Sequence, residues 1–214
     1  MTYDLIIFDC DGVLVDSEPI SNRLMAERLT AAGLPTTTEQ CVERYMGGSL
    51  ASLMADAERR LGHRLPDSFA ADFDAACFAV FDAELEAVAG IEALLDSLDG
   101  VATCVASSGA HAKLRRTLGR TGLLPRFEGR IFSASDVARG KPSPDLFLHA
   151  AERMGVDPAR CAVIEDSPMG VAAAVAAGMS VFGYAGRTPR ERLARDGVTV
   201  FGDMAELRPL LRVA

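Results

Sequence analysis

The stretch LIIFDCDGV, residues 5–13, decides the fold that this sequence predicts. Its four apolar residues from Leu5 to Phe8 are typical of a strand that is buried on both faces of a parallel sheet. Asp9 and Asp11 follow, and side chains two apart on a strand point the same way. We therefore expect both carboxylates in one cleft at the carboxyl end of the strand, where open α/β sheets bind ligands.

Two carboxylates at such a place suit a hard divalent cation, and they suit a division of roles between a nucleophile and a proton donor. The alternative is a β-hairpin, because Asp11-Gly12 between two apolar runs is also a strong two-residue turn signal. This motif alone leaves both interpretations open.

Apolar runs that alternate with helical stretches predict an α/β fold, a Rossmann-like three-layer parallel sheet. The expected strands are residues 5–8, 101–106, 130–133, 162–164 and 180–184. Roughly ninety residues separate the first two strands, far more than one crossover needs. We therefore expect an α/β core domain of residues 1–16 and 84–214 and an inserted small α-helical cap domain of residues 17–83. The expected cap helices lie near residues 17–32, 39–45, 50–62 and 67–83.

Acidic residues also end a second apolar run, at Glu165 and Asp166. Ser167 and Pro168 can cap and begin a helix of small residues, which lets that helix lie close to the sheet. We interpret the two acids as part of a metal site. The alternative, helix capping by Asp166 or Ser167, leaves Glu165 unexplained.

Two further loops carry groups that suit a phosphate. Ser107, Ser108 and Gly109 offer hydroxyl and backbone N–H donors before a helix, although an ordinary capping turn has the same composition. Lys141 offers an ammonium group and is bracketed by Gly140 and Pro142, so its placement looks specified rather than incidental.

Composition limits the class of protein. The chain has 214 residues, 49% of them hydrophobic, so it can bury a full core, and its net charge of −8 argues against a nucleic-acid or anionic-membrane partner. No apolar stretch reaches the length needed to span a bilayer, and the first residues lack a basic segment that leads into a secretory core, so we expect a cytoplasmic protein. The five cysteines are expected to be buried thiols. We expect a monomer, with a dimer as the alternative.

Taken together, the strand ends make the sequence resemble the haloacid dehalogenase superfamily over essentially the whole chain. The strings DCDGVLVDSE, KPSPDLFLHAAE and IEDSPMGVAAAVAAGM, which begin at residues 9, 141 and 164, carry the resemblance. The subgroup it indicates contains the phosphatases and phosphosugar mutases that have a helical cap after the first motif. Asp11 argues against a dehalogenase, because displacement of a halide requires no acid there.

The resemblance implies a role for each strand end. Asp9 would attack phosphorus to form an aspartyl-phosphate, and Asp11 would act as general acid and then as general base. Mg²⁺ would be held by Asp9, the backbone carbonyl of Asp11 and Asp166, with Glu165 as a further ligand or a partner of the ligands. The phosphoryl oxygens would be bound by Ser107 and Lys141, with Ser108 and Gly109 alongside, and Lys141 would also bridge to Asp9 electrostatically. The cap candidates for substrate contact are Arg23, Arg44, Tyr45 and the loop Gly47-Gly48-Ser49.

The expected function is Mg²⁺-dependent hydrolysis of a small phosphorylated metabolite, a sugar phosphate or a phosphosugar acid. A phosphosugar mutase is the first alternative. Mutases of this group carry a histidine and an arginine in the cap where this chain has Ser21 and Leu50, so we favour hydrolysis. A non-catalytic α/β binding module is the second alternative, which the intact chemistry of all four strand ends disfavours.

Overall fold

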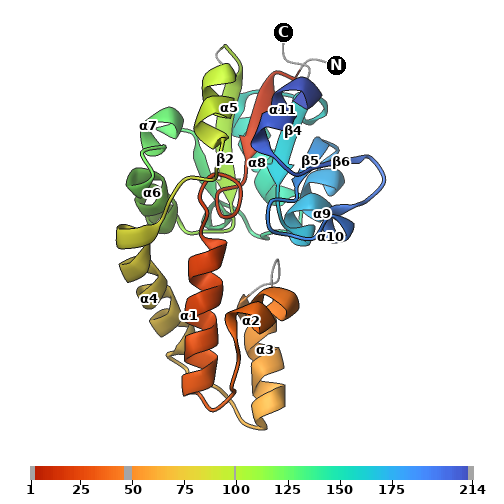
Figure 1. Ribbon diagram of the computed structural model, residues 1–214. Coiled ribbons are helices and arrows are strands. Elements are labelled where there is room, and N and C mark those ends of the chain that lie inside the picture. Colours follow the sequence, from red (N-terminus) through yellow and green to blue (C-terminus); the bar gives the residue numbers. More distant parts are fainter. Residues whose placement is uncertain (1–2, 46–49, 99, 212–214) are drawn as a thin grey trace. The chain divides into compact units, whose positions relative to one another are not determined.

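The computed structural model describes residues 3–45, 50–98 and 100–211. The chain divides into two compact units, one made of Met1–Asp16 with Glu86–Ala214 and the other of Ser17–Leu85. The larger unit is an α/β unit and the smaller one is all helical (Figure 1).

A six-stranded sheet of order β3-β2-β1-β4-β5-β6 forms the centre of the larger unit, and every neighbouring pair of strands is parallel. The strands are β1 (Leu5–Phe8), β2 (Ala102–Ser107), β3 (Ile131–Ser133), β4 (Cys161–Glu165), β5 (Ser180–Tyr184) and β6 (Val198–Phe201). The strand order reverses direction at β1, which lies between β2 and β4. Crevices outside the carboxyl ends of strands at such a switch point are where open α/β sheets bind ligands.

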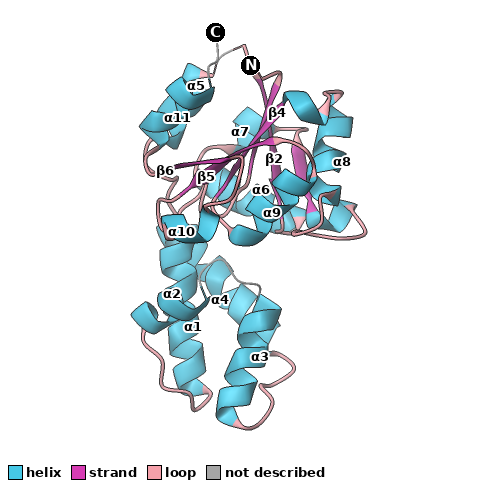
Figure 2. Ribbon diagram, turned by 90° about the vertical axis from the view of Figure 1, so that its right-hand side faces the viewer, coloured by secondary structure: helices cyan, strands magenta, loops and turns pink. Residues whose placement is uncertain are grey.

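Helices cover both faces of this sheet (Figure 2). They are α5 (Ile91–Ser97), α6 (His111–Arg120), α7 (Leu124–Phe127), α8 (Asp145–Met154), α9 (Pro168–Ala176), α10 (Arg190–Leu193) and α11 (Met204–Leu211), with short 3-10 turns η1 (Ala134–Asp136) and η2 (Pro158–Arg160). The predicted Rossmann-like three-layer fold with an inserted helical part is confirmed. The strand β6 was not predicted, because its run of four residues is short and alternates with a polar threonine.

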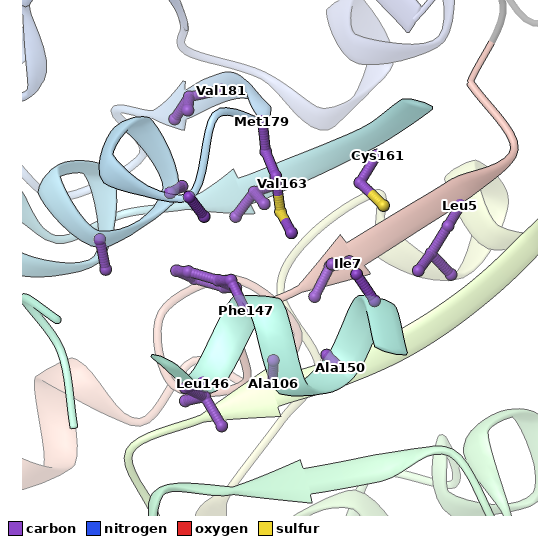
Figure 3. Close-up of a cluster of buried hydrophobic side chains, with 14 of the residues drawn as sticks. Leu5, Ile7, Ala106, Leu146, Phe147, Ala150, Cys161, Val163, Met179 and Val181 are labelled. Atoms are coloured by element: carbon purple, nitrogen blue, oxygen red, sulfur yellow. The ribbon is translucent and has the colours of Figure 1, made fainter. Parts of the chain in front are cut away.

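Alternation along β1 explains why both faces are apolar. Leu5 and Ile7 enter one hydrophobic cluster with α8 and α9, in which Phe147 and Val163 are also buried (Figure 3). Phe8 has the opposite orientation, and its ring packs edge-on against Phe127 of α7. All four residues of β1 are fully buried. The end of β1 is therefore fixed from both sides, which gives the residues that follow it a rigid support.

The helical unit has its own small core. Its helices are α1 (Glu18–Ala31), α2 (Thr38–Tyr45), α3 (Leu50–Leu61) and α4 (Phe69–Glu84). Met25, Leu29, Cys41, Ala57 and Phe69 are buried together at its centre. None of the helices in the described residues is long and apolar enough to cross a lipid bilayer.

Candidate active site

Asp9 is the first residue after β1 and is buried at the centre of the sheet edge. Its N–H donates to the carbonyl of Ile164 on β4 at 3.0 Å, which fixes the backbone between the two strands. Burial raises the pKa of Asp9 to about 6; the charge of Lys141 opposes this rise and that of Glu165 adds to it. The carboxylate thus lies where its charge is costly unless a cation accompanies it.

Lys141 supplies that cation. Its Nζ donates to Asp9 Oδ1 at 2.7 Å, to Glu165 Oε1 at 2.6 Å and to the carbonyl of Ala106 at 3.1 Å. The Lys141 side chain is only 3% exposed, and its ammonium lies 4.9 Å from the ring centre of Phe147. Burial alone lowers the pKa of Lys141, but the two carboxylates raise it above its ordinary value. The lysine therefore remains charged and joins the ends of β1, β2 and β4.

Glu165 and Asp166 end β4, and both are buried. The hydroxyl of Ser167 accepts from the N–H of Gly170 and so caps α9, whereas the N–H and hydroxyl of Ser167 donate to Glu165 Oε2 at 2.9 Å each. Ser167 therefore does cap α9. The acidic residue at position 165, which capping left unexplained, binds Lys141. The small residue at Gly170 lets α9 approach, because a Cβ there would overlap the Glu165 carboxylate.

Asp11 lies in a loop and not on a strand, which corrects one argument made from the sequence. The strand β1 ends at Phe8, and the carbonyl of Cys10 then accepts from the N–H groups of Leu14 and Val15 at 2.9 and 3.0 Å. Because the chain turns here, strand alternation does not align the side chains of Asp9 and Asp11. The alternative, a two-residue hairpin, is not formed as a pair of strands either; the described residues 9–16 make a tight turn around the carbonyl of Cys10, with one isolated β-bridge between Asp11 and Val15.

The carboxylate of Asp11 has a cation of its own, which sequence reasoning missed. Lys113, in the first turn of α6, donates from Nζ to Asp11 Oδ2 at 2.7 Å. The signal that could have found it is compositional, since Lys113 and Lys141 are the only lysines in the chain. Cys10, between the two acids, is buried, and burial raises the pKa of its thiol further above the neutral range. All five cysteines are buried thiols, as predicted, and none forms a disulfide in the part of the chain that the structure describes.

Ser107 ends β2 and is buried, whereas Ser108 is exposed and Gly109 is half-buried. The N–H of Gly109 lies 3.4 Å from the hydroxyl of Ser107, and its carbonyl accepts from Ser133 at 2.7 Å. Neither serine caps α6, because the cap residue is Ala110 and no side chain bonds there. An ordinary capping turn therefore does not explain these serines.

The candidates in the helical unit differ in what the structure shows of them. Arg44 is exposed in the last turn of α2. Arg23 pairs with Glu84 at 2.6 Å, and the hydroxyl of Tyr45 donates to Asp56 at 2.9 Å. The predicted loop with Gly47, residues 46–49, lies outside the described residues.

The acidic groups at the sheet edge fit a divalent cation. One oxygen each from Asp9, Glu165 and Asp166 lie within 4.8 Å of one another, and all three residues are buried. Carboxylate oxygens are the ligands that Mg²⁺ prefers. Glu165 already uses both oxygens in bonds to Lys141 and Ser167, so Asp9 and Asp166 are the members better suited to ligate an ion directly.

Comparison with known proteins identifies the family to which this fold and these site residues correspond. The model of the haloacid dehalogenase-like hydrolase family matches residues 3–178. The 6-phosphogluconate phosphatase of Escherichia coli K12 is 32% identical over 208 residues, which cover 97% of this chain and 94% of the relative.

Solved structures show the same likeness. A conserved haloacid dehalogenase-like protein of unknown function from Agrobacterium tumefaciens has a TM-score of 0.90 at 36% identity, covering 98% of this chain and 97% of that one. A haloacid dehalogenase family hydrolase from Deinococcus radiodurans, with bound phosphate and sodium, has a TM-score of 0.82 at 31% identity over 98% and 95% of the two chains.

The chain therefore belongs to the haloacid dehalogenase-like hydrolase family. The predicted resemblance is confirmed, and so is the prediction of an enzyme of the phosphatase type within this family.

Proposed function

We propose that the protein is a Mg²⁺-dependent phosphatase that hydrolyses a small phosphate monoester, a sugar phosphate or a phosphosugar acid, through an aspartyl-phosphate on Asp9. The observation that carries this proposal is the position of Lys141, whose buried ammonium joins Asp9 to Glu165 at the carboxyl ends of β1 and β4. The ammonium of Lys141 lies beside the Asp9 carboxylate at the point where the strand order reverses. Its positive charge offsets the negative charge of a phosphoryl group bound there, which favours attack on an anionic ester.

Asp9 is the proposed nucleophile because it is buried, acidic and fixed between two strands. In the first step a carboxylate oxygen of Asp9 attacks phosphorus, and the bond from phosphorus to the leaving oxygen breaks. The carboxyl proton of Asp11 goes to that oxygen. In the second step Asp11 accepts a proton from water, whose oxygen attacks phosphorus and releases inorganic phosphate and the Asp9 carboxylate.

Binding of the phosphoryl oxygens is assigned to Lys141 and Ser107, with Ser108 and Gly109 at the start of the same loop. Support comes from the position of Ser107 at the end of β2, from the bond of Lys141 to the carbonyl of Ala106 on the same strand, and from the failure of the serines to cap α6. In the helical unit, Arg44 remains the candidate for a contact with the leaving group, because it is exposed and charged. Gly47 remains a candidate from the resemblance alone.

The proposed metal ligands are the carboxylates of Asp9 and Asp166 and the backbone carbonyl of Asp11. Glu165 completes the acidic group and orients Lys141 through their 2.6 Å contact. When bound, Mg²⁺ supplies positive charge that offsets repulsion between an anionic nucleophile and an anionic ester. The proposal also places the enzyme in the cytoplasm, in keeping with five buried thiols, and describes it as a monomer.

A direct test is release of phosphate from p-nitrophenyl phosphate with and without Mg²⁺, compared between the wild type and Asp9→Asn. We expect Mg²⁺-dependent turnover that EDTA abolishes and that the asparagine variant lacks. Equal, metal-independent rates in the two proteins would contradict the enzyme assignment.

The substrate class needs a second experiment. A panel of sugar phosphates, phosphosugar acids and nucleotides is screened for phosphate release, with 6-phosphogluconate included because a 32% identical relative is named for it. We expect the highest kcat/KM among phosphosugars and their acids. Incubation with hexose 1-phosphates separates hydrolase from mutase, since accumulation of a 6-phosphate without free phosphate would identify a mutase.

A further inference from the structure

The two lysines of the chain are placed unlike its arginines. The sequence has 22 lysine and arginine residues, and only Lys113 and Lys141 are lysines. Each contacts one carboxylate of the Asp9-Cys10-Asp11 motif: Lys141 binds Asp9 and Lys113 binds Asp11, both at 2.7 Å. The ammonium of lysine is a compact point charge, whereas the guanidinium of arginine is a wide planar fork. A chain that uses arginine elsewhere thus has its only two lysine ammonium groups at this motif.

Lys113 is held in a defined environment. Its side chain is 31% exposed, and that of Asp11 is 24% exposed, so the pair is partly shielded from water. Burial alone lowers the pKa of Lys113, but Asp11 raises it above its ordinary value, so the lysine stays charged. Partial burial strengthens such a pair relative to an ion pair on the surface.

The helix that carries Lys113 also supports the neighbouring residue of the loop. Thr117 lies one turn further along α6, on the same face, and its hydroxyl is 3.9 Å from the sulfur of Cys10. Lys113 and Thr117 thus contact two consecutive loop residues, Asp11 and Cys10. The first two turns of α6 therefore fix the loop behind the nucleophile.

We propose that Lys113 is a positioning residue that holds the carboxyl group of Asp11 in place for proton transfer to the leaving oxygen. This inference rests on the proposed function. Lys113 donates to Oδ2, and the proposal assigns the transferred proton to the other carboxyl oxygen, Oδ1. When the bond between phosphorus and the leaving oxygen breaks, that oxygen takes the bonding pair and the proton from Oδ1, and Asp11 is left as a carboxylate beside the ammonium of Lys113.

The alternative is that Lys113 binds the phosphoryl group itself. The two roles differ in how they depend on the leaving group. A dinitrophenolate leaves without a proton, whereas an alkoxide of a sugar needs one. Loss of a group that acts through Asp11 should lower kcat/KM for the alkyl ester only. Loss of a group that binds the phosphoryl oxygens should lower kcat/KM for both esters.

The experiment measures kcat/KM of the wild type and Lys113→Met with an alkyl phosphate and with 2,4-dinitrophenyl phosphate. The value of kcat/KM reports only the steps up to departure of the leaving group, so it does not depend on the later role of Asp11 as a base. We expect a loss of about 10-fold to 100-fold with the alkyl ester and less than about 3-fold with the dinitrophenyl ester. Lys113→Arg should recover part of the loss, since it keeps the charge.

Arg115→Met is the matched control. It also removes a cation from α6, and Arg115 pairs with Glu128 on the surface at 2.9 Å. This variant should retain wild-type kcat/KM with both esters. Equal losses with both esters in Lys113→Met, or no loss with either, would overturn the proposal.

A double variant tests whether Lys113 acts through Asp11. In an Asp11→Asn background, adding Lys113→Met should change kcat/KM for the alkyl ester by less than about 2-fold, because the group it positions is already gone. Losses that multiply would contradict the proposal. If the wild type itself releases no phosphate from either ester, the proposed function fails; if it does and the variants do not differ as stated, only the role of Lys113 fails.

Discussion

Gly12 and Asp166 are in such close contact that a Cβ atom on Gly12 would overlap the carboxylate of Asp166. Gly12 also has a φ of +77°, in the left-handed region that residues with a Cβ rarely adopt. The loop after Asp11 can therefore pass beside the end of β4 only if this position has no side chain. This contact joins two distant parts of the sequence in one acidic site.

Replacement of Gly12 by alanine should displace Asp166 as well as strain the backbone. We expect Gly12→Ala to lower kcat/KM by at least about 10-fold and to cost about 1 kcal/mol of unfolding free energy. Gly129→Ala is the matched control, because Gly129 has a φ of +76° and a Cβ there would meet no atom within 4 Å. The control should lose similar stability and keep its activity; equal loss of activity in both would rule out the contact with Asp166 as the cause.

A second glycine pair tests how α9 packs on Glu165. An alanine in a helix is normally more stable than a glycine by about 0.5–1 kcal/mol, but a Cβ on Gly170 would overlap the Glu165 carboxylate. Gly170→Ala should therefore destabilise the protein in urea denaturation. Gly119→Ala, within α6, meets only Leu124 at 3.8 Å and should stabilise it. Stabilisation by both changes would show that Glu165 moves at little cost.

Loss of Lys141 should unbalance the buried charges. Lys141→Met leaves Asp9 and Glu165 without their shared cation, and removal of one partner from a buried ionic group costs about 3–5 kcal/mol. The double variant Lys141→Met with Glu165→Gln should recover part of this loss, because one of the two carboxylates is then neutral. Urea denaturation of the metal-free proteins measures both; a double variant that is less stable than the single one would contradict this account.

The pKa of Asp9 predicts a pH dependence of metal binding. Without metal its folded pKa of about 6 lies above its ordinary value of 3.8, so between these values the folded state holds a proton that the unfolded state has released. This contribution to stability is present at low pH and is lost as pH rises towards 6. Mg²⁺ needs the carboxylate form, so its affinity should fall below about pH 6.

Thermal unfolding with and without Mg²⁺ at pH 5 and pH 7.5 checks this prediction. The increase in Tm on adding Mg²⁺ should be clearly larger at pH 7.5 for the wild type. Asp9→Asn, whose side chain does not titrate, should show a smaller increase and a weaker dependence on pH. An increase of the same size at both pH values in the wild type would exclude Asp9 as a ligand whose protonation limits binding.

Much of the fold and of the candidate site follows from local sequence. The buried run before Asp9 predicts β1, and the small residues after Pro168 predict a helix close to the sheet, because periodicity and capping act over a few residues. The carboxylates and serines could be proposed as well, since parallel strands bring their carboxyl ends to one edge. Lys141, which lies in the loop before α8, was proposed because Gly140 and Pro142 bracket it. The strand β6 was missed because its short alternating run carries little local signal.

The sequence by itself determined which chemical groups stand at the strand ends and that a helical part interrupts the sheet. The pairing of Lys141 with Asp9 was predicted from the resemblance, but only the tertiary structure decided that Lys141 also binds Glu165 and that Lys113 binds Asp11. The physical reason is that charge pairing depends on distances between side chains more than 20 residues apart in sequence, which no local pattern reports. The close contact of Gly12 with Asp166 is of the same kind, because it exists only once β1 and β4 lie side by side.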